Sequence, residues 1–320
     1  MMMRPYILSA VGILCVASLQ PALAGEGGAP SSAGWRMDGT GRYPDAKPVT
    51  EWGPETNVIW AAPMSNWGNA SPVLAGDRIF LTSEPDELVC VAKTNGAVLW
   101  RRSVRLSDTW TDEDRAGAEE KQKKSDELKK EYQRLDDEIN DTWEAKSKDP
   151  TNQVLKVKYK SLRETQATVL SDIGKLSRWA PAKTEPSNGY TSATPVTDGK
   201  HVWGVMGTGV AACFDMAGER KWVKYIEKSK HQEGHAASSV LCDGKLLIHI
   251  TNLRAHDPLT GELIWESPGQ PRSWGTPCPA VVNGTNVVVT GRGRIVRVSD
   301  GQQVGVEAGK LEYASPLLID

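Results

Sequence analysis

The sequence predicts an all-β propeller of four-stranded antiparallel blades, into which an antiparallel α-helical coiled-coil hairpin is inserted. Three observations support this fold class. A polar turn with Gly recurs along the chain and leads into a short apolar strand. A second motif, which opens with Ser or Thr, recurs at intervals of 38 to 44 residues. A charged segment of about eighty residues interrupts the series once.

The recurring turn is the first signature of a blade. In the stretch from Asp257 to Trp265, Gly261 provides the positive φ that a tight turn between strands needs. A fourth turn, Ser299-Asp300-Gly301, is followed by Gly305 where a Trp would stand. The three complete copies place Trp four residues after Gly: Gly96 and Trp100, Gly218 and Trp222, and Gly261 and Trp265.

The second signature precedes each turn and opens an apolar strand. Each such strand ends at a further polar turn with Gly, which gives four β-rich runs per unit without the 3.6-residue periodicity of helical repeats. The sequence therefore predicts that residues 70–104 and 193–309 form consecutive blades, about four in number, each with its opening strand innermost. The copies of this signature are Ser71-Pro72-Val73, Thr194-Pro195-Val196, Ser238-Ser239-Val240 and Thr276-Pro277.

Both ends of the repeat series are incomplete units. Residues 57–60 reproduce the closing strand of a repeat, so we expect Val58 to Ala61 to be the outer strand of a blade whose remainder lies elsewhere. Residues 314–320 reproduce the opening strand of a fifth unit. A blade that stops after one strand leaves an unpaired edge, and we therefore interpret the sequence as a C-terminally truncated fragment.

The N-terminus has the pattern of a secretory signal peptide. Arg4 is followed by an apolar run from residue 6 to residue 19, and Ala22-Leu23-Ala24 is an A-x-A cleavage site. The run is too short to cross a membrane and no second such run follows, so we expect a secreted or periplasmic protein without a transmembrane segment. The formal net charge of −2 argues against a nucleic-acid partner, because there is no basic excess to meet phosphates.

The interrupting segment has the composition of two long helices. Lys, Glu and Asp are dense, and no Gly occurs between residues 118 and 173. The apolar spacing alternates between four and three residues, as in a coiled-coil seam. The seam residues are Leu128, Tyr132, Leu135 and Ile139 in the first helix, and Leu155, Tyr159, Leu162, Gln166, Val169, Ile173 and Leu176 in the second.

We expect the two helices to pair as an antiparallel hairpin around the turn at residues 149–152. Residues 112–148 contain 13 acidic and 9 basic side chains, whereas residues 154–178 contain 2 acidic and 6 basic ones, so opposite net charges favour their packing. Counting outward from the turn pairs Trp143 with Leu155, Ile139 with Tyr159, and Leu135 with Leu162. The predicted division of the chain is a signal peptide at 1–24, a leader at 25–56, propeller at 57–104, the coiled-coil insertion at 105–188, and propeller at 189–320.

The turn motif resembles the repeat of the PQQ-like β-propellers, a family that includes quinoprotein dehydrogenases and the outer-membrane assembly scaffold BamB. The resemblance lies in Thr260 to Trp265 and the preceding Ala255-His256-Asp257, and it covers residues 57–104 and 189–320. It implies seven or eight blades in the full protein. It also implies that one Trp of each unit docks between neighbouring blades, namely Trp60, Trp100, Trp222 and Trp265. Gly305 departs from this pattern.

The resemblance also defines what a quinone site would need. In the dehydrogenases the quinone lies between a Trp and a disulfide of adjacent cysteines, and acidic and amide side chains hold a calcium ion. This sequence has no adjacent cysteines and no recognisable calcium-ligand set, so we expect no cofactor; PQQ with calcium belongs to the alternative interpretation alone. The four cysteines that remain after cleavage leave three disulfide pairings open: Cys90, Cys213, Cys242 and Cys278.

Two groups of side chains are candidates for binding. The first, His231-Gln232-Glu233-Gly234-His235, has the histidine spacing of a metal motif, but Gly234 disfavours the helix that the motif needs, so we expect a solvated loop and no metal. The second group precedes the opening strands and should gather at one mouth of the propeller channel, where it either lines a ligand or peptide site or, as we favour, packs over the core. This second group is Trp67, Tyr190, His235 and Trp274.

Together these features predict an exported, non-catalytic scaffold or binding module. We expect protein partners to bind at the propeller face and at the coiled-coil arm. The alternative is a PQQ-dependent dehydrogenase with cofactor residues partly outside this sequence.

Overall fold

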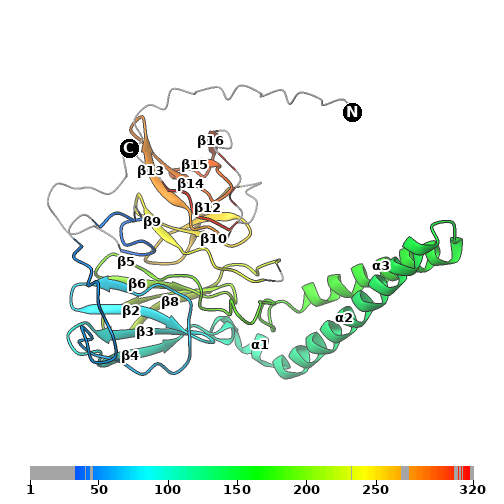
Figure 1. Cartoon of the computed structure of the whole chain (residues 1–320), viewed down its shortest axis with the longest axis horizontal. Coiled ribbons are helices and arrows are strands. Elements are labelled where there is room, and N and C mark those ends of the chain that lie inside the picture. Colours follow the sequence, from blue (N-terminus) through cyan, green and yellow to red (C-terminus); the bar gives the residue numbers. More distant parts are fainter. Residues whose placement is uncertain are drawn as a thin grey trace.

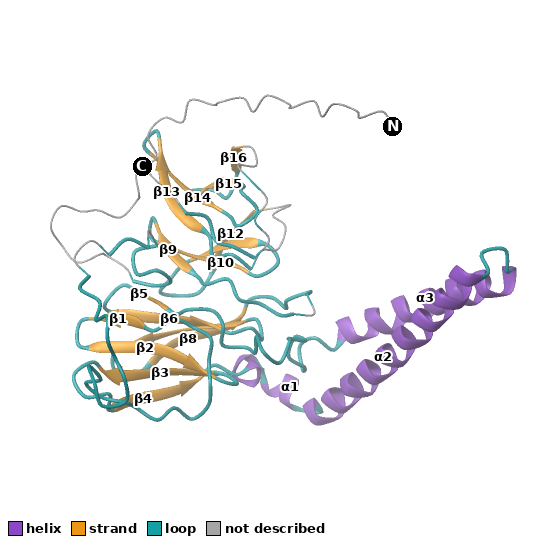
Figure 2. Cartoon of the chain, viewed as in Figure 1, coloured by secondary structure: helices purple, strands orange, loops and turns teal. Residues whose placement is uncertain are grey.

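The computed structural model describes residues 33–39, 41–43, 46–231, 233–267, 274–305, 309, 311 and 313–317. The predicted signal peptide, residues 1–24, lies outside the described residues, as does the first part of the predicted leader. The described chain forms four β-sheets and a helical arm that extends away from them (Figures 1 and 2).

Each sheet has four antiparallel strands in the order in which they occur in the sequence. Sheet one contains β1 (Val73–Ala75), β2 (Arg78–Ser83), β3 (Glu87–Ala92) and β4 (Val98–Ser103). Sheet two contains β5 (Val196–Thr197), β6 (His201–Val205), β7 (Val210–Asp215) and β8 (Arg220–Tyr225). Sheet three contains β9 (Val240–Cys242), β10 (Lys245–His249), β11 (Leu253–His256) and β12 (Leu263–Ser267). Sheet four contains β13 (Cys278–Val282), β14 (Thr285–Val289), β15 (Ile295–Arg297) and β16 (Gln303–Gly305).

The first strands of successive sheets are neighbours. Contacts join β1 to β5, β5 to β9, and β9 to β13, so these strands follow one another along the inner side of the series. The predicted four-stranded units are therefore confirmed, with the opening strand of each on the inside. Four sheets arranged in this way are consecutive propeller blades.

A hydrophobic layer fills each space between neighbouring blades. Phe80 and Trp100 of the first blade pack with Phe214 of the second, and the ring centroids of Trp100 and Phe214 are 6.0 Å apart. Trp222 of the second blade joins the layer shared with the third, and Trp265 joins the layer shared with the fourth. Since strand residues alternate between the two faces of a sheet, the second and third blades can each contribute one face to each of two neighbours.

The segment between the first two blades is helical. It contains the short helices η1 (Leu106–Thr109) and α1 (Asp112–Arg115) and the long helices α2 (Ala118–Lys148) and α3 (Gln153–Lys175). Figure 1 shows α2 and α3 side by side, with the turn that joins them at the end farthest from the sheets. We call residues 112–175 the arm. Among the described residues, neither long helix is apolar enough over its length to cross a lipid bilayer.

Side-chain contacts fix how α2 and α3 pair. The Nε2 of Gln166, a buried seam residue, donates to Asp136 Oδ1 at 2.9 Å. The ring centroids of Trp143 and Tyr159 are 5.9 Å apart. Asn152 caps α3, because its Oδ1 accepts hydrogen bonds from the first backbone N–H groups of that helix. The coiled-coil geometry of the seam stays a prediction.

The two ends of the arm are clamped together near the blades. The indole Nε1 of Trp110 donates to the carbonyl of Arg178 at 2.8 Å, and that of Trp179 donates to the carbonyl of Asp114 at 2.9 Å. Arg178 in turn donates to the Asp114 carboxylate at 2.7 Å, which holds the pKa of that carboxyl at about 2. These reciprocal bonds fix the root of the arm.

The two incomplete units form no strands among the described residues. Val58 to Ala61 has no strand partner there, and Ile59 is exposed, so its pairing with a blade that lies elsewhere stays a prediction. Its Trp60 nevertheless contacts the first blade. Residues 313–317 form no strand either, although Ser315 accepts a hydrogen bond from the backbone N–H of Thr276 at 2.9 Å.

Candidate functional site

A ladder of hydroxyl groups links the starts of the inner strands. In each step the backbone N–H of one Ser or Thr donates to the side-chain hydroxyl of the corresponding residue in the next unit. The steps are Ser71 to Thr194 (3.2 Å), Thr194 to Ser238 (2.9 Å), Ser238 to Thr276 (3.0 Å) and Thr276 to Ser315 (2.9 Å). The ladder holds the blades at a regular spacing, so the loops that precede these residues lie next to one another.

These loops also pair with the turn between the second and third strand of a blade. The backbone N–H of Glu84 donates to the carbonyl of Trp67 at 2.8 Å, and that of Gly207 donates to the carbonyl of Tyr190 at 2.7 Å. The two kinds of segment therefore form a single surface, at the end of the blades from which the arm leaves. We call it the loop face; it comprises residues 66–70, 84–86, 188–193, 206–209, 231, 233–237, 250–252, 274–276, 290–293 and 313–314.

A buried carboxylate fastens the loop face between the first two blades. Glu84 Oε1 accepts hydrogen bonds from the backbone N–H groups of Tyr190 and Thr191, both at 2.7 Å, and from the Thr191 hydroxyl at 2.5 Å. Glu84 is 8% exposed. Because one of its oxygens accepts hydrogen bonds from three donors of the neighbouring loop, this carboxylate joins the first blade to the second.

The predicted mouth residues fall into three environments. Trp67 is 46% exposed and lies against the backbone of Gly189, next to Tyr190. Tyr190 is half-buried, and its hydroxyl donates to the carbonyl of Ala182 at 2.9 Å. These two residues are thus brought together between the first and second blades.

His235 lies below the surface. It is 3% exposed, and burial, together with the neighbouring His249, lowers its pKa to about 4. Its Nε2 has no hydrogen-bond partner among the described residues. A neutral, buried imidazole belongs to the core, so of the four predicted residues this one contributes packing.

The fourth predicted residue is the centre of an aromatic stack. Trp274 is half-buried; its ring meets His231 edge-on at 4.4 Å between centroids and stacks on Tyr313 at 4.7 Å, with the planes 20° apart. Tyr313 is 64% exposed. We call these three residues the aromatic stack. It gives the loop face a partly exposed, flat aromatic surface on the side of the fourth blade.

The prediction from the sequence missed part of this surface. Tyr313 stands two residues before Ser315, as Trp274 stands two residues before Thr276, so aligning the repeats on the hydroxyl ladder would have found it. By contrast, Trp67 and Tyr190 stand four residues before the ladder position. The four predicted residues therefore occupy different depths in their loops, which explains their different environments.

The predicted docking tryptophans share one arrangement. Each indole Nε1 donates to a backbone carbonyl of the next turn: Trp60 to Lys93 (2.8 Å), Trp100 to Met216 (2.9 Å), Trp222 to Pro258 (2.8 Å) and Trp265 to Val298 (2.9 Å). Each ring also lies against the Gly of that turn. Trp60 thus contacts the first blade as the other three contact the second, third and fourth.

The described residues do not match the donors of a quinone and calcium site. All four described cysteines are buried, each in its own blade, and none of them is in a disulfide. Burial raises the pKa of the Cys90 thiol to about 11 and that of Cys213 to about 12. Within the described ranges no three His, Cys, Asp or Glu side chains are grouped as metal ligands would be. His231 instead contacts Trp274 and accepts a hydrogen bond from the backbone of Glu233.

Comparison with known families identifies the repeat. The family model described as the outer membrane protein assembly factor BamB matches residues 45–251. The chain belongs to this family of PQQ-like repeat proteins. A comparison with curated proteins finds no match.

Solved structures that resemble this PQQ-like repeat protein include a BamB and two quinohemoprotein alcohol dehydrogenases. BamB from Moraxella catarrhalis has 10% identity over 79% of this chain and 68% of its own, with a TM-score of 0.33. Quinohemoprotein alcohol dehydrogenase ADHIIG from Pseudomonas putida HK5 has 12% identity over 66% of this chain and 22% of its own, with a TM-score of 0.35. The quinohemoprotein alcohol dehydrogenase of Comamonas testosteroni has 8% identity over 79% of this chain and 46% of its own, with a TM-score of 0.33. The chain spans less than half the length of these dehydrogenases.

Proposed function

We propose that this PQQ-like repeat protein is an exported, non-catalytic scaffold that binds a protein partner at its loop face. The observation that supports this most directly is the aromatic stack. Trp274 and Tyr313 present flat apolar surface at the face where the blade loops gather, and such side chains are the usual anchors of protein interfaces. The description of the family model, an assembly factor, supports the same proposal.

The arm extends the reach of the scaffold. Its root is fixed by the bonds between Asp114 and Arg178, and the segment that follows the root accepts a hydrogen bond from Tyr190 of the loop face at Ala182. An arm fixed at its root holds its far end in a defined direction from the blades (Figure 1). We propose that the arm pairs as a coiled coil, that residues 105–188 act as one insertion, and that the arm contacts a second body while the loop face contacts the first.

The docking tryptophans have a structural role in this proposal. Their indoles join each blade to the next, and their Nε1 groups are occupied by backbone carbonyls. They are therefore separate from the binding surface. The dehydrogenase alternative would require cofactor ligands that the described residues lack.

Site-specific photocrosslinking tests the loop face. A photoreactive phenylalanine analogue at Tyr313, which is 64% exposed, should crosslink to a protein partner in cells. The same analogue at Leu259, which is 59% exposed in the turn between β11 and β12, is the matched control. Equal crosslinking from both positions, or none from Tyr313, would remove the loop face as the binding surface.

An activity assay tests the alternative. The protein incubated with pyrroloquinoline quinone and calcium should show no dye-linked oxidation of alcohols or sugars. Turnover that depends on added quinone would replace the scaffold proposal with the dehydrogenase.

A further inference from the structure

The far end of the arm differs in charge from its root. Residues 143–163, which we call the distal end, contain Lys146, Lys148, Lys156, Lys158, Lys160 and Arg163 against Glu144 and Asp149, a net charge of +4. Residues 112–142 contain 12 acidic and 7 basic side chains, a net charge of −5. The arm is therefore an electric dipole whose positive end is the one farthest from the blades (Figure 1).

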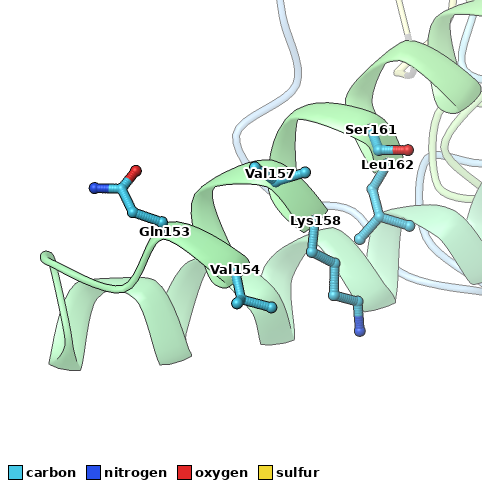
Figure 3. A pocket seen from close by; sticks show the side chains of 6 residues that line it. All are labelled: Gln153, Val154, Val157, Lys158, Ser161 and Leu162. Atoms are coloured by element: carbon cyan, nitrogen blue, oxygen red, sulfur yellow. The ribbon is translucent and has the colours of Figure 1, made fainter.

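Apolar side chains are exposed among these positive charges. Val154 is 76% exposed and Val157 is 68% exposed, both in the first two turns of α3. They border a shallow depression that is also lined by Gln153, Lys158, Ser161 and Leu162 (Figure 3). In Figure 3 Val154 and Lys158 point to the same side of the helix, so apolar and cationic groups share one surface.

Several of the lysines have no carboxylate partner. Lys158 Nζ is 3.0 Å from Glu138 Oε1, and Lys160 makes only a 3.9 Å contact with Glu164, in which both side chains are largely exposed. In the part of the chain that the structure describes, Lys148 and Lys156 form no ion pair. Their charges are therefore available to a partner.

The spacing places these groups where a flat surface can reach them together. Val154, Val157 and Lys160 follow one another at three-residue intervals, which puts them on one side of α3. Lys156 lies beside Lys160 on the same helix. A helix side with valines in the middle and lysines around them fits the interface of an anionic bilayer, where apolar groups enter the acyl boundary and lysines meet the headgroups.

We propose that the distal end of the arm binds the surface of a membrane that contains anionic phospholipids. A second copy of the chain fits less well, because two such ends would bring the lysines of both copies together. The dipole also orients the arm, since the anionic surface attracts the positive distal end and repels the negative root. The membrane is then the second body that the arm contacts in the proposed function. This inference rests on that proposal only for the reach of the arm.

Vesicle flotation tests the proposal. The full chain should bind vesicles with about one third phosphatidylglycerol in phosphatidylcholine, and not vesicles of phosphatidylcholine alone. Each lysine near such a surface strengthens binding roughly five-fold, so Lys156→Ala with Lys160→Ala should weaken it roughly 25-fold. Binding should also fall as salt rises from about 0.05 to about 0.5 M, since exposed charges are then screened.

The matched control is Lys123→Ala with Lys130→Ala, two exposed lysines near the root of α2. This pair removes the same charge but should leave vesicle binding unchanged, and helicity by circular dichroism should be the same in both variants. Val154→Ser with Val157→Ser should weaken binding without altering its salt dependence.

The proposal would be overturned if the chain did not bind the anionic vesicles. It would also be overturned if the Lys156/Lys160 variant and the Lys123/Lys130 variant lost binding equally. Crosslinking from Tyr313 does not depend on the arm, so failure of the membrane proposal and failure of the scaffold proposal are distinguishable.

Discussion

The contact between Trp222 and Gly261 offers a measurement of how strongly one blade holds the next. Gly261 has a φ of +69°, and a Cβ added there would lie 2.8 Å from the Trp222 ring. Gly244 has a φ of +67°, with no atom within 4 Å of an added Cβ. Both glycines sit in turns between strands, so Ala at either position meets the same backbone cost, and only Ala at 261 displaces the indole.

The expected magnitudes follow from these distances. Gly244→Ala should destabilise the protein by about 1–2 kcal/mol, the cost of a Cβ in left-handed backbone. Gly261→Ala should cost about 1–3 kcal/mol more, because the indole is 8% exposed and must move within a packed layer. Trp222→Ala alone should cost about 3–5 kcal/mol through the space it leaves.

A double-mutant cycle separates the two contributions. In the Trp222→Ala background no indole opposes Ala at 261, so Gly261→Ala should there cost only about as much as Gly244→Ala. Equilibrium unfolding in urea, followed by circular dichroism, provides the free energies of unfolding for all variants. If Gly261→Ala and Gly244→Ala were equally destabilising in the wild-type background, the indole would not be docked in the way described.

Three further predictions concern the arm, a histidine and the thiols. Replacing residues 127–171 by a short Gly/Ser turn should leave the thermal unfolding temperature of the blades unchanged, since the root clamp is retained; a large drop would show that the arm is integral to the core. The pKa of His235 is lowered from 6.5 to about 4, so stability should fall as pH decreases from about 6.5 to 4. His235→Gln should remove about 3 kcal/mol of that dependence, and a pH profile identical to that of the wild-type protein would contradict this. Burial raises the pKa of Cys90 to about 11, so a thiol reagent should label the four buried cysteines only after unfolding, and rapid labelling of the native protein would refute the burial.

The sequence by itself determined the repeating units. Gly at 96, 218 and 261 permits the positive φ of a tight turn. The Trp four residues later indicates a strand that buries one large side chain. These are properties of neighbouring residues, so they are visible without knowledge of the fold. The charged, Gly-free segment after the first unit likewise predicted two helices, because its apolar residues are spaced alternately four and three residues apart.

Only the tertiary structure decided how the loop face is built. Glu84 reaches Thr191, more than a hundred residues away, and Trp274 meets His231 and Tyr313 from the neighbouring units. Such contacts depend on the angle and spacing between blades, which no local pattern encodes. The same reason explains why the strand-like sequence from Val58 to Ala61 forms no strand with the described residues, since a strand needs a hydrogen-bonding partner. A repeat motif specifies each blade, and the packing of one blade on the next determines which loop side chains meet.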